Sequence, residues 1–391
     1  MKRYFIFVLL SIFWSFNSSF AQFGSSNVDT DSTQQEMNFV SNTITNVMDL
    51  MTYEKGRFSF GIFPVMDYEE YKGVEIGLMP VFRFAPKDTV SQGRFYRPTT
   101  IMPQFSFSTK GQVNIETDFV SFIKGKWSIV SRLNYLKYQD VFYGVGDPLE
   151  EEERSTYNTE RFFWYLELLR NINDVFFVGV KADMMYARHF DVTGGSFNQD
   201  IVGFEEGAAL GVGPTIKFDT RDNTLYPTNG SLLSVSAIFY DKALGSDFDF
   251  QSYNLDMRKY VTLKEDKTIL AIQGVVNSTQ GDAPFYKLPR FGGSRGMRGI
   301  SHPAKYADKN NFFTQAEIRQ HLWWRFSAAA FVGIGNTSEK FDHNLFNDIK
   351  TVYGFGGRFQ LLPNDKINFR ADMGFGPNGD RAFYFSVTEA F

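Results

Sequence analysis

The sequence predicts an all-β fold: a single 16-stranded antiparallel transmembrane β-barrel with a short N-terminal periplasmic helix. Apolar and polar residues alternate with a period of two from residue 57 to residue 391, and the chain holds 44 Phe and 19 Tyr. Strands of a membrane barrel alternate in this way, and aromatic girdles mark both of its interfaces with water. The mean hydropathy of −0.26 fits a barrel whose polar residues face the lumen.

The first 21 residues have the pattern of an export signal. Lys2 and Arg3 form a charged start, residues 4–14 an apolar centre, and Ser19 and Ala21 a small-x-small cleavage site. The apolar centre is shorter than the roughly 20 residues that a membrane-spanning helix needs. We therefore expect residues 1–21 to be a signal peptide.

Residues 22–55 are predicted to be a periplasmic lead with one amphipathic helix at about residues 33–51. Ser32 and Gln35 are spaced as a capping box. Six apolar residues follow at helical spacing: Met37, Val40, Ile44, Val47, Met48 and Met51. The apolar stripe could pack against the barrel mouth or lumen, the membrane surface or a partner.

The barrel itself is predicted over residues 56–391. In the segment 367–375, for example, Asn368, Arg370 and Asp372 alternate with apolar residues. A polar face of Arg, Asp, Gln and Gly suits a wet lumen, with the apolar face turned to lipid. Segments of this kind recur about 16 times, which sets the predicted number of strands.

The connections between these segments alternate in length, as expected if both ends of the barrel chain are periplasmic. Short turns are predicted at 124–125, 171–174, 263–267, 323–325 and 362–366, and longer loops at 144–158, 192–203, 279–310 and 338–350. The connection 86–98 departs from this rule, because it is long where a short turn is expected.

One motif lies in the turn after the eighth predicted strand. It consists of Asp219, Arg221, Asp222, Pro227 and Gly230. Opposite charges at a turn can fix it through paired hydrogen bonds, and proline and glycine supply turn geometry.

A second motif lies inside the long loop 279–310 and ends with Met297, Arg298, Gly299 and Ile300. Its glycines let the loop bend tightly and approach other backbone closely. If the loop folds into the lumen, Arg298 needs an acidic partner, because a buried and unpaired charge is costly.

Together these motifs resemble the BamA/TamA outer-membrane assembly superfamily, also called the bacterial surface antigen family. That family has an Asp-x-Arg…Pro-x-x-Gly turn after its eighth strand and a Gly-Gly…Val/Leu-Arg-Gly-Phe/Tyr motif in its sixth surface loop. Both motifs fall at the same ordinal strands here, and Phe383, Phe385 and Phe391 are similar to its C-terminal assembly signal. The resemblance covers about residues 56–391.

The resemblance implies acidic partners for Arg298 on the twelfth and thirteenth strands. Glu317 matches the first position, but residues 333–335 read Gly-Ile-Gly where the family has Asp-x-Gly. One expected partner is therefore missing. Relatives also carry POTRA domains before the barrel, and residues 22–55 are too few for one, so we expect a POTRA-less member.

Several kinds of chemistry are not expected. A net charge of −4 leaves no basic field for nucleic acid, and there is no Cys for thiol chemistry. Residues 292–296 fit Gly-x-Ser-x-Gly, but that motif needs a strand before it and a helix after it. The four His residues lack metal-ligand spacing. We expect neither an enzyme nor a bound cofactor or metal.

The functional hypothesis is a barrel that helps insert, assemble or translocate proteins at the outer membrane of a Gram-negative-type bacterium. Its N-terminus would be periplasmic, and its partners outer-membrane lipid and client or partner proteins of the outer membrane or periplasm. The first strand, with Gly61 and Pro64, would pair weakly with the last and form a lateral seam. The alternatives are a transport pore and a structural scaffold subunit of a partner complex.

Overall fold

The computed structural model describes residues 42, 51–69, 73–86, 97–146, 148, 150–264, 267–362 and 367–391. The predicted signal peptide and, apart from Asn42 and Met51, the predicted helix at 33–51 lie outside the described residues. Contacts within the chain separate Met1–Met51 from a compact unit, Thr52–Phe391, and this unit is described below. Among the described residues, no helix is both long and apolar enough to cross a membrane.

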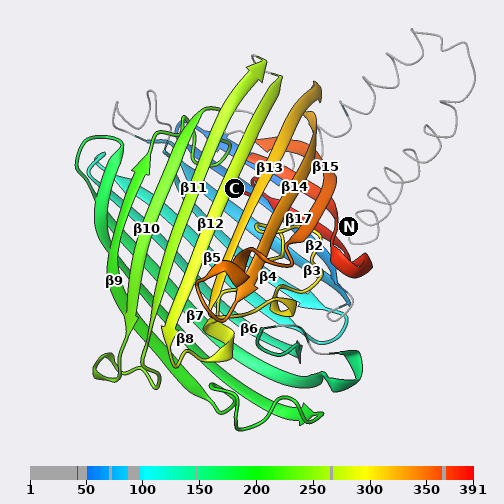
Figure 1. Ribbon diagram of the computed structural model, residues 1–391. Helices are drawn as coiled ribbons and strands as arrows, with labels where there is room; N and C mark the ends of the chain where they lie inside the picture. The colour runs from blue at the N-terminus through cyan, green and yellow to red at the C-terminus, as the bar shows by residue number, and fades with distance from the viewer. Residues whose placement is uncertain are drawn as a thin grey trace, which may run out of the picture. The chain divides into compact units, whose positions relative to one another are not determined.

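The unit Thr52–Phe391 is one antiparallel sheet of 17 strands (Figure 1). The strands are β1 (Thr52–Lys55), β2 (Phe58–Glu69), β3 (Gly73–Phe84), β4 (Thr99–Ser108), β5 (Val113–Ile123), β6 (Trp127–Phe142), β7 (Ser155–Asn171), β8 (Phe176–Thr193), β9 (Gly207–Asp219), β10 (Gly230–Tyr240), β11 (Phe250–Lys264), β12 (Thr268–Gly281), β13 (Asn310–Trp323), β14 (Phe326–Ser338), β15 (Lys350–Leu362), β16 (Ile367–Phe375) and β17 (Arg381–Val387).

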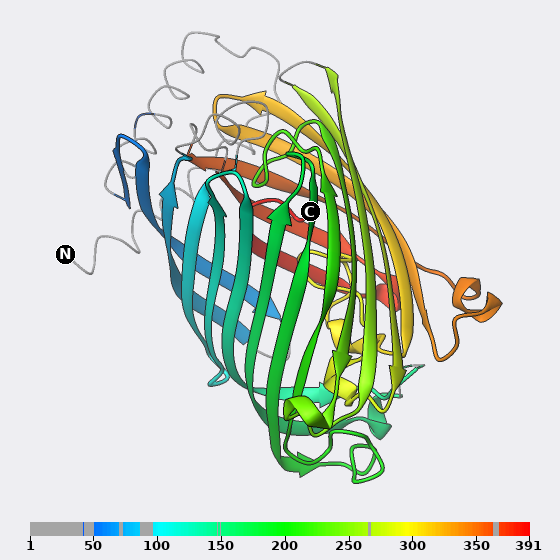
Figure 2. The ribbon, with the colours of Figure 1, turned by 90° about the vertical axis from the view of Figure 1, so that its left-hand side faces the viewer.

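Strands β2 to β17 lie beside one another in chain order and curve into a barrel-shaped wall (Figures 1 and 2). The strand order also places β17 beside β2. The remaining strand, β1, precedes the predicted start of the barrel. It forms a hairpin with β2 through a two-residue turn in which Gly56 has a φ of 61°, a conformation that suits glycine. The sheet therefore begins at Thr52.

The five predicted short turns are confirmed: they join β5 to β6, β7 to β8, β11 to β12, β13 to β14 and β15 to β16. Long connections follow β6, β8, β12 and β14, as predicted, but the alternation is incomplete, because the loop-end connections 70–72, 109–112 and 376–380 are also short. Two connections at the turn end are long: residues 85–98, and residues 220–229, which hold the Asp-x-Arg motif. The longest loop, residues 282–309 between β12 and β13, is called the lumen loop below.

The two faces of the wall have opposite polarity. Tyr353 and Phe355 on β15 are 60% and 59% exposed on the outside. On the inside, Arg358 of the same strand and Arg370 of β16 are almost fully buried. A soluble sheet protein has the reverse arrangement, with its apolar side chains in the core. This polarity agrees with the predicted wet lumen and lipid-facing exterior.

Apolar contacts hold the lumen loop against the inner face of the wall. Its residues Phe291, Met297, Ile300 and Tyr306 form one buried cluster with three wall residues, Val275, Phe313 and Val352. A second cluster of rings near the loop end of the wall includes Phe142, Tyr157 and Phe197, and Phe285 of the lumen loop packs against it. The lumen loop is therefore part of the folded interior, and this positions the site described next.

Candidate functional site

The tip of the lumen loop carries a fully buried arginine to the inner face of the wall. Arg298 Nη1 lies 2.6 Å from Glu317 Oε2 on β13 and 2.6 Å from Asp372 Oδ2 on β16, and all three side chains are 0% exposed. The guanidinium carbon also lies 3.7 Å from the centre of the Phe331 ring, within cation–π range. We call Arg298, Glu317 and Asp372 the arginine lock.

The lock belongs to a larger network of alternating charges. Four guanidinium groups meet three carboxylates there: Arg298, Arg319, Arg358 and Arg370 with Glu317, Asp372 and Glu389. Arg319 Nε lies 2.7 Å from Glu317, and Arg358 Nη1 lies 2.5 Å from Asp372. Each carboxylate is thus shared between arginines from different elements. Such sharing is what makes the burial of so many charges tolerable.

Glycines permit the close approach of the loop tip to β16. A Cβ atom at Gly374 would lie 2.6 Å from the carbonyl carbon of Arg298, so any larger residue would push the tip away. Gly299 has a φ of 131°, and a Cβ there would lie 2.5 Å from the Phe375 carbonyl oxygen. The Tyr384 hydroxyl of β17 donates to the Ile300 carbonyl at 2.9 Å and accepts from Gly299 N at 3.2 Å.

Polar anchors also hold the lumen loop farther from its tip. His302 Nε2 lies 2.9 Å from Asp140 of β6, and Lys305 Nζ lies 2.6 Å from Asp380, which precedes β17. The Tyr286 hydroxyl donates to the Gly207 carbonyl at 3.3 Å, and burial raises the pKa of this hydroxyl above its usual range. The loop is therefore attached to widely separated strands of the wall.

The five residues of the turn motif come together between β9 and β10. Arg221 donates through Nε and Nη2 to the two carboxylate oxygens of Asp219, both at 2.9 Å. Asp222 Oδ1 accepts from the backbone of Thr228 at 2.9 Å, on the chain segment that includes Pro227. Gly230 has a φ of 105°, and a Cβ there would lie 2.2 Å from the Thr220 carbonyl oxygen. These contacts define a rigid turn.

Phe391 lies on the opposite side of the wall from Phe383 and Phe385. Phe383 and Phe385 are 45% and 37% exposed on the outside, but Phe391 is buried. The strand ends at Val387 because Thr388 adopts a φ of 77°, which turns residues 388–391 into the lumen. There Phe391 joins a cluster with Tyr260, and Arg319 Nη2 donates to its main-chain oxygen at 3.1 Å. Phe391 therefore does not continue the outward face on which Phe383 and Phe385 lie.

The boundary between β2 and β17, called the seam below, differs from the rest of the wall. On one edge, β2 pairs with β3 along all 12 of its residues. Its other edge faces β17, and there β1 pairs with the stretch from Phe58 to Gly61. Beyond that stretch, β17 supplies a strand of only seven residues. Two short strands therefore share the edge that one long strand would otherwise cover.

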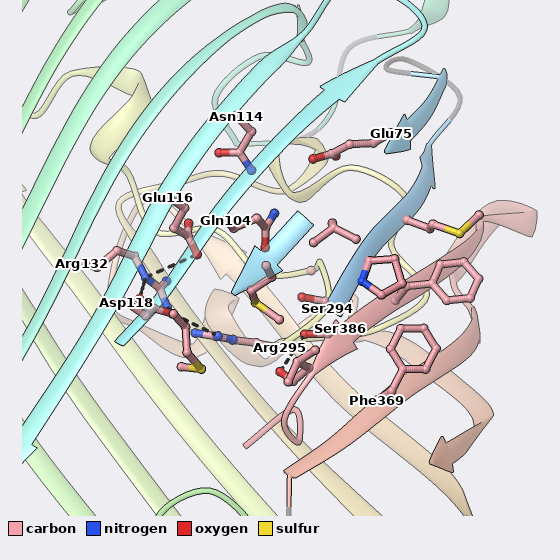
Figure 3. Close-up of a pocket in the computed structure, with 18 residues that line it drawn as sticks. Glu75, Gln104, Asn114, Glu116, Asp118, Arg132, Ser294, Arg295, Phe369 and Ser386 are labelled. Atoms are coloured by element: carbon pink, nitrogen blue, oxygen red, sulfur yellow. Dashed lines mark hydrogen bonds and ion pairs between the residues drawn. The ribbon is translucent and has the colours of Figure 1, made fainter. Parts of the chain in front are cut away.

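A cavity of about 410 Å³ adjoins the seam (Figure 3). Its lining includes consecutive residues of both seam strands: Pro64, Val65 and Met66 of β2, and Phe385, Ser386 and Val387 of β17. Side chains of consecutive strand residues point to opposite faces, so the cavity extends to the boundary between the two strands. Its far side is charged, with Arg132 of β6 bound to Asp118 of β5 at 2.6 Å (Figure 3).

Comparison with known proteins identifies the family. Residues 186–391, more than half of the chain, match the sequence pattern of the Omp85 superfamily domain. The chain belongs to the Omp85 superfamily. The resemblance to BamA/TamA-type barrels seen in the two motifs is thereby confirmed. Membership of this superfamily implies an outer-membrane location.

Solved structures agree with an Omp85 fold. BamA from Haemophilus ducreyi lacking POTRA domains 1–3 has a TM-score of 0.54 and 14% identity, over 86% of this chain and 70% of that chain. CdiB from Acinetobacter baumannii has a TM-score of 0.52 and 14% identity, and CdiB from Escherichia coli 0.53 and 9%. This chain covers 60% and 62% of those two CdiB chains. A search of the curated proteins gave no match.

Sequence reasoning located part of this candidate site. Arg298 and Glu317 are brought together, whereas residues 333–335 of β14 supply no acid. The second acid is Asp372 on β16, which the prediction missed although Asp372 alternates inward with Arg370. Tyr384 was also missed, because its role depends on the path of the lumen loop. Within the described ranges, no three His, Asp or Glu side chains are grouped as metal ligands would be.

The first testable prediction concerns the lock. Replacing Glu317 with Ala removes a carboxylate that Arg298, Arg319 and Arg358 share, and the four buried guanidinium groups then have only Asp372 and Glu389. Glu317→Ala should therefore lower the free energy of unfolding by about 3–5 kcal/mol. This change is measured by unfolding the barrel with urea in lipid or detergent. The folded and unfolded fractions are read from their different mobilities on a gel.

The matched control is Glu160→Ala. Glu160 pairs with Lys137 and Arg188, whose side chains are about half exposed, so its loss should cost only about 0–1 kcal/mol. The double variant, Glu317→Ala with Arg298→Met, measures the coupling between the two residues. Because Arg298→Met removes one of the buried positive charges, the double variant should lose less unfolding free energy than the two single variants lose together. Equal stability of Glu317→Ala and wild type would contradict the lock.

Proposed function

We propose that this Omp85 protein inserts, assembles or translocates other proteins at the outer membrane by opening its wall at the seam. In this proposal β2 to β17 close into a 16-stranded barrel with both ends in the periplasm, and the protein acts without enzymatic chemistry. The observation that carries the proposal is the incomplete cover of the β2 edge, which faces β17.

The seam offers few backbone hydrogen bonds compared with the longest pairings in the wall. Strand β6 pairs with β7 along all 16 of its residues. At the seam, β17 contributes seven residues at most, and Pro64 of β2 has no N–H to donate to a neighbouring strand. Each hydrogen bond contributes about 0.5–1.5 kcal/mol net. The β2–β17 boundary is therefore among the weakly paired boundaries of this wall, together with β3–β4, β9–β10 and β16–β17, which have seven residue pairs each.

An opened seam would expose a strand edge that a client can use. Extended segments add to exposed sheet edges through main-chain hydrogen bonds, in the mode called β-augmentation. Strand β1 covers only four residues of this edge and is joined to β2 by a two-residue turn, and isolated hairpins are marginal in water. A client strand could displace β1 and extend along β2 toward the adjoining cavity.

The arginine lock indicates that the two strands at the seam differ in how firmly they are held. Asp372 of β16 binds Arg298, and the Tyr384 hydroxyl of β17 binds the backbone N–H of Gly299 and the carbonyl of Ile300 at the loop tip. The lumen loop thereby fastens the last two strands to β13 and the interior. Strand β2 has no comparable attachment to the lumen loop among the described contacts. We infer that β2, rather than β17, moves when the seam opens.

The second testable prediction is that a covalent staple across the seam abolishes function. Because β1 pairs with residues 58–61 of β2, the staple belongs at residues 64–66, which line the same cavity as residues 385–387 of β17. The chain has no native Cys, so a pair such as Val65→Cys with Ser386→Cys can be tested without background. The oxidised pair should fail to support the growth or assembly phenotype of the wild-type gene, and reduction should restore it.

Each single-Cys variant controls for the substitution itself, and a Cys pair between β6 and β7, such as Val130 with Glu167, controls for cross-linking of the wall. Normal function of the fully oxidised seam pair would show that the seam need not open.

A transport pore is the second candidate, because the lumen is lined by polar residues and contains the 410 Å³ cavity. The lumen loop argues against it, since its buried tip fills the interior next to β16.

The third testable prediction separates these candidates. We expect small or unsteady conductance of the intact protein in planar bilayers, and an increase when residues 282–309 are shortened, because the loop obstructs the lumen. Shortening the loop 241–249 between β10 and β11 is the control and should change little. A large and steady conductance of the intact protein would favour the pore.

A further inference from the structure

The loop between β14 and β15, residues 339–349, exposes an unusual group of large apolar side chains. Phe341, Phe346 and Ile349 are 61%, 59% and 42% exposed, although they lie within a few residues of one another. Single exposed apolar residues are ordinary, whereas a group of them marks a surface that meets another apolar phase. We call these three residues the loop wedge.

The loop turns outward, away from the lumen. Figure 2 shows its short 3-10 helix (His343–Phe346, orange) projecting to the side of the wall, unlike the lumen loop. The Phe346 ring lies 5.1 Å from the ring of Phe312 on β13. Phe313 belongs to the buried interior cluster, and neighbouring strand residues face opposite sides, so Phe312 faces outward. The loop therefore folds back over the outside of the wall.

The outer wall beneath this loop is continuous with the lipid-facing surface. Val332 of β14 is 49% exposed, and Tyr353 and Phe355 of β15 are 60% and 59% exposed. These residues belong to the outward face of a barrel strand, which lipid covers in an outer-membrane protein. The loop wedge continues this apolar surface past the ends of β14 and β15.

The loop is held in this shape by specific contacts. Asp342 caps its 3-10 helix by accepting from Asn344 N at 2.9 Å, and Leu345 of the same helix is fully buried. Asn310 of β13 donates to the Glu339 carbonyl at 2.9 Å, and Asn336 of β14 donates to the Asn347 carbonyl. With Leu345 turned inward, the helix presents Phe346 outward. The exposure of the wedge is thus a defined feature of the fold.

We propose that the loop wedge is a membrane anchor: Phe341, Phe346 and Ile349 insert at the lipid–water interface of the leaflet on the loop side of the barrel. Apolar side chains such as these bury at the boundary between lipid headgroups and acyl chains, and the binding free energy grows with the apolar area that leaves water. The neighbouring Lys340 and Asp348 remain at headgroup level. The partner is the lipid surface itself, and the proposal does not depend on whether the seam opens.

The test places one fluorophore on the loop. Because the chain has no Cys, Phe346→Cys carries a single environment-sensitive NBD label in the full-length barrel. The barrel is reconstituted in vesicles of phosphatidylethanolamine and phosphatidylglycerol. Label quenching is measured with nitroxide-bearing phospholipid and, separately, with aqueous iodide. Phe355→Cys on the lipid-facing wall and Gln199→Cys on an exposed loop are the two reference positions.

The proposal predicts blue-shifted emission at position 346, strong quenching by the nitroxide lipid as at 355, and weak quenching by iodide. Phe341→Cys should behave in the same way and replaces Phe346→Cys if that variant fails to fold. Iodide quenching equal to that at 199 would overturn the proposal, because the loop would then lie in water. Protection from both quenchers would also overturn it, since a protein surface rather than lipid would then cover the wedge.

Discussion

The structure depends above all on one buried charge, the guanidinium of Arg298. A positive charge inside the wall is tolerable only with carboxylates in contact, and Glu317 and Asp372 supply them from β13 and β16. Because the arginine stands on a loop and its partners on separate strands, satisfying the charge also fixes the path of the loop. The glycines at 299 and 374 belong to the same constraint, since a side chain at either position would keep the tip from its partners.

This constraint gives the two sides of the seam different mechanical support. Strand β17 is bound through Tyr384 to the loop tip, and the residues after it are bound through Glu389 to Arg358 at 2.9 Å. The inward turn at Thr388 puts a β-branched residue at positive φ, a costly conformation that surrounding contacts must offset. That turn also shortens β17 and leaves part of the β2 edge to β1. The inward turn after β17 therefore leaves the seam incompletely paired.

The sequence predicted the wall well because its signals are local. Period-two alternation and the lengths of turns and loops depend on neighbouring residues, and they placed the strands and connections closely. It missed β1 because four residues, Thr52–Lys55, are too few to show a period. It found Glu317 through the family pattern but missed Asp372, since which inward-facing acid meets Arg298 depends on how a distant loop crosses the lumen. It gave no sign of the inward turn at Thr388, because alternation along a strand does not indicate where the chain leaves the sheet.

The central claim, that the charge network holds the loop tip inside the lumen, is tested most directly by the accessibility of Ile300, which is fully buried. Ile300→Cys in the folded barrel should react very slowly with a bulky, membrane-impermeant maleimide, whereas Asp282→Cys, at the exposed start of the same loop, should react readily. Adding Arg298→Ala to Ile300→Cys should make the thiol reactive, because the tip is then released. Rapid labelling of Ile300→Cys with Arg298 intact would contradict the account.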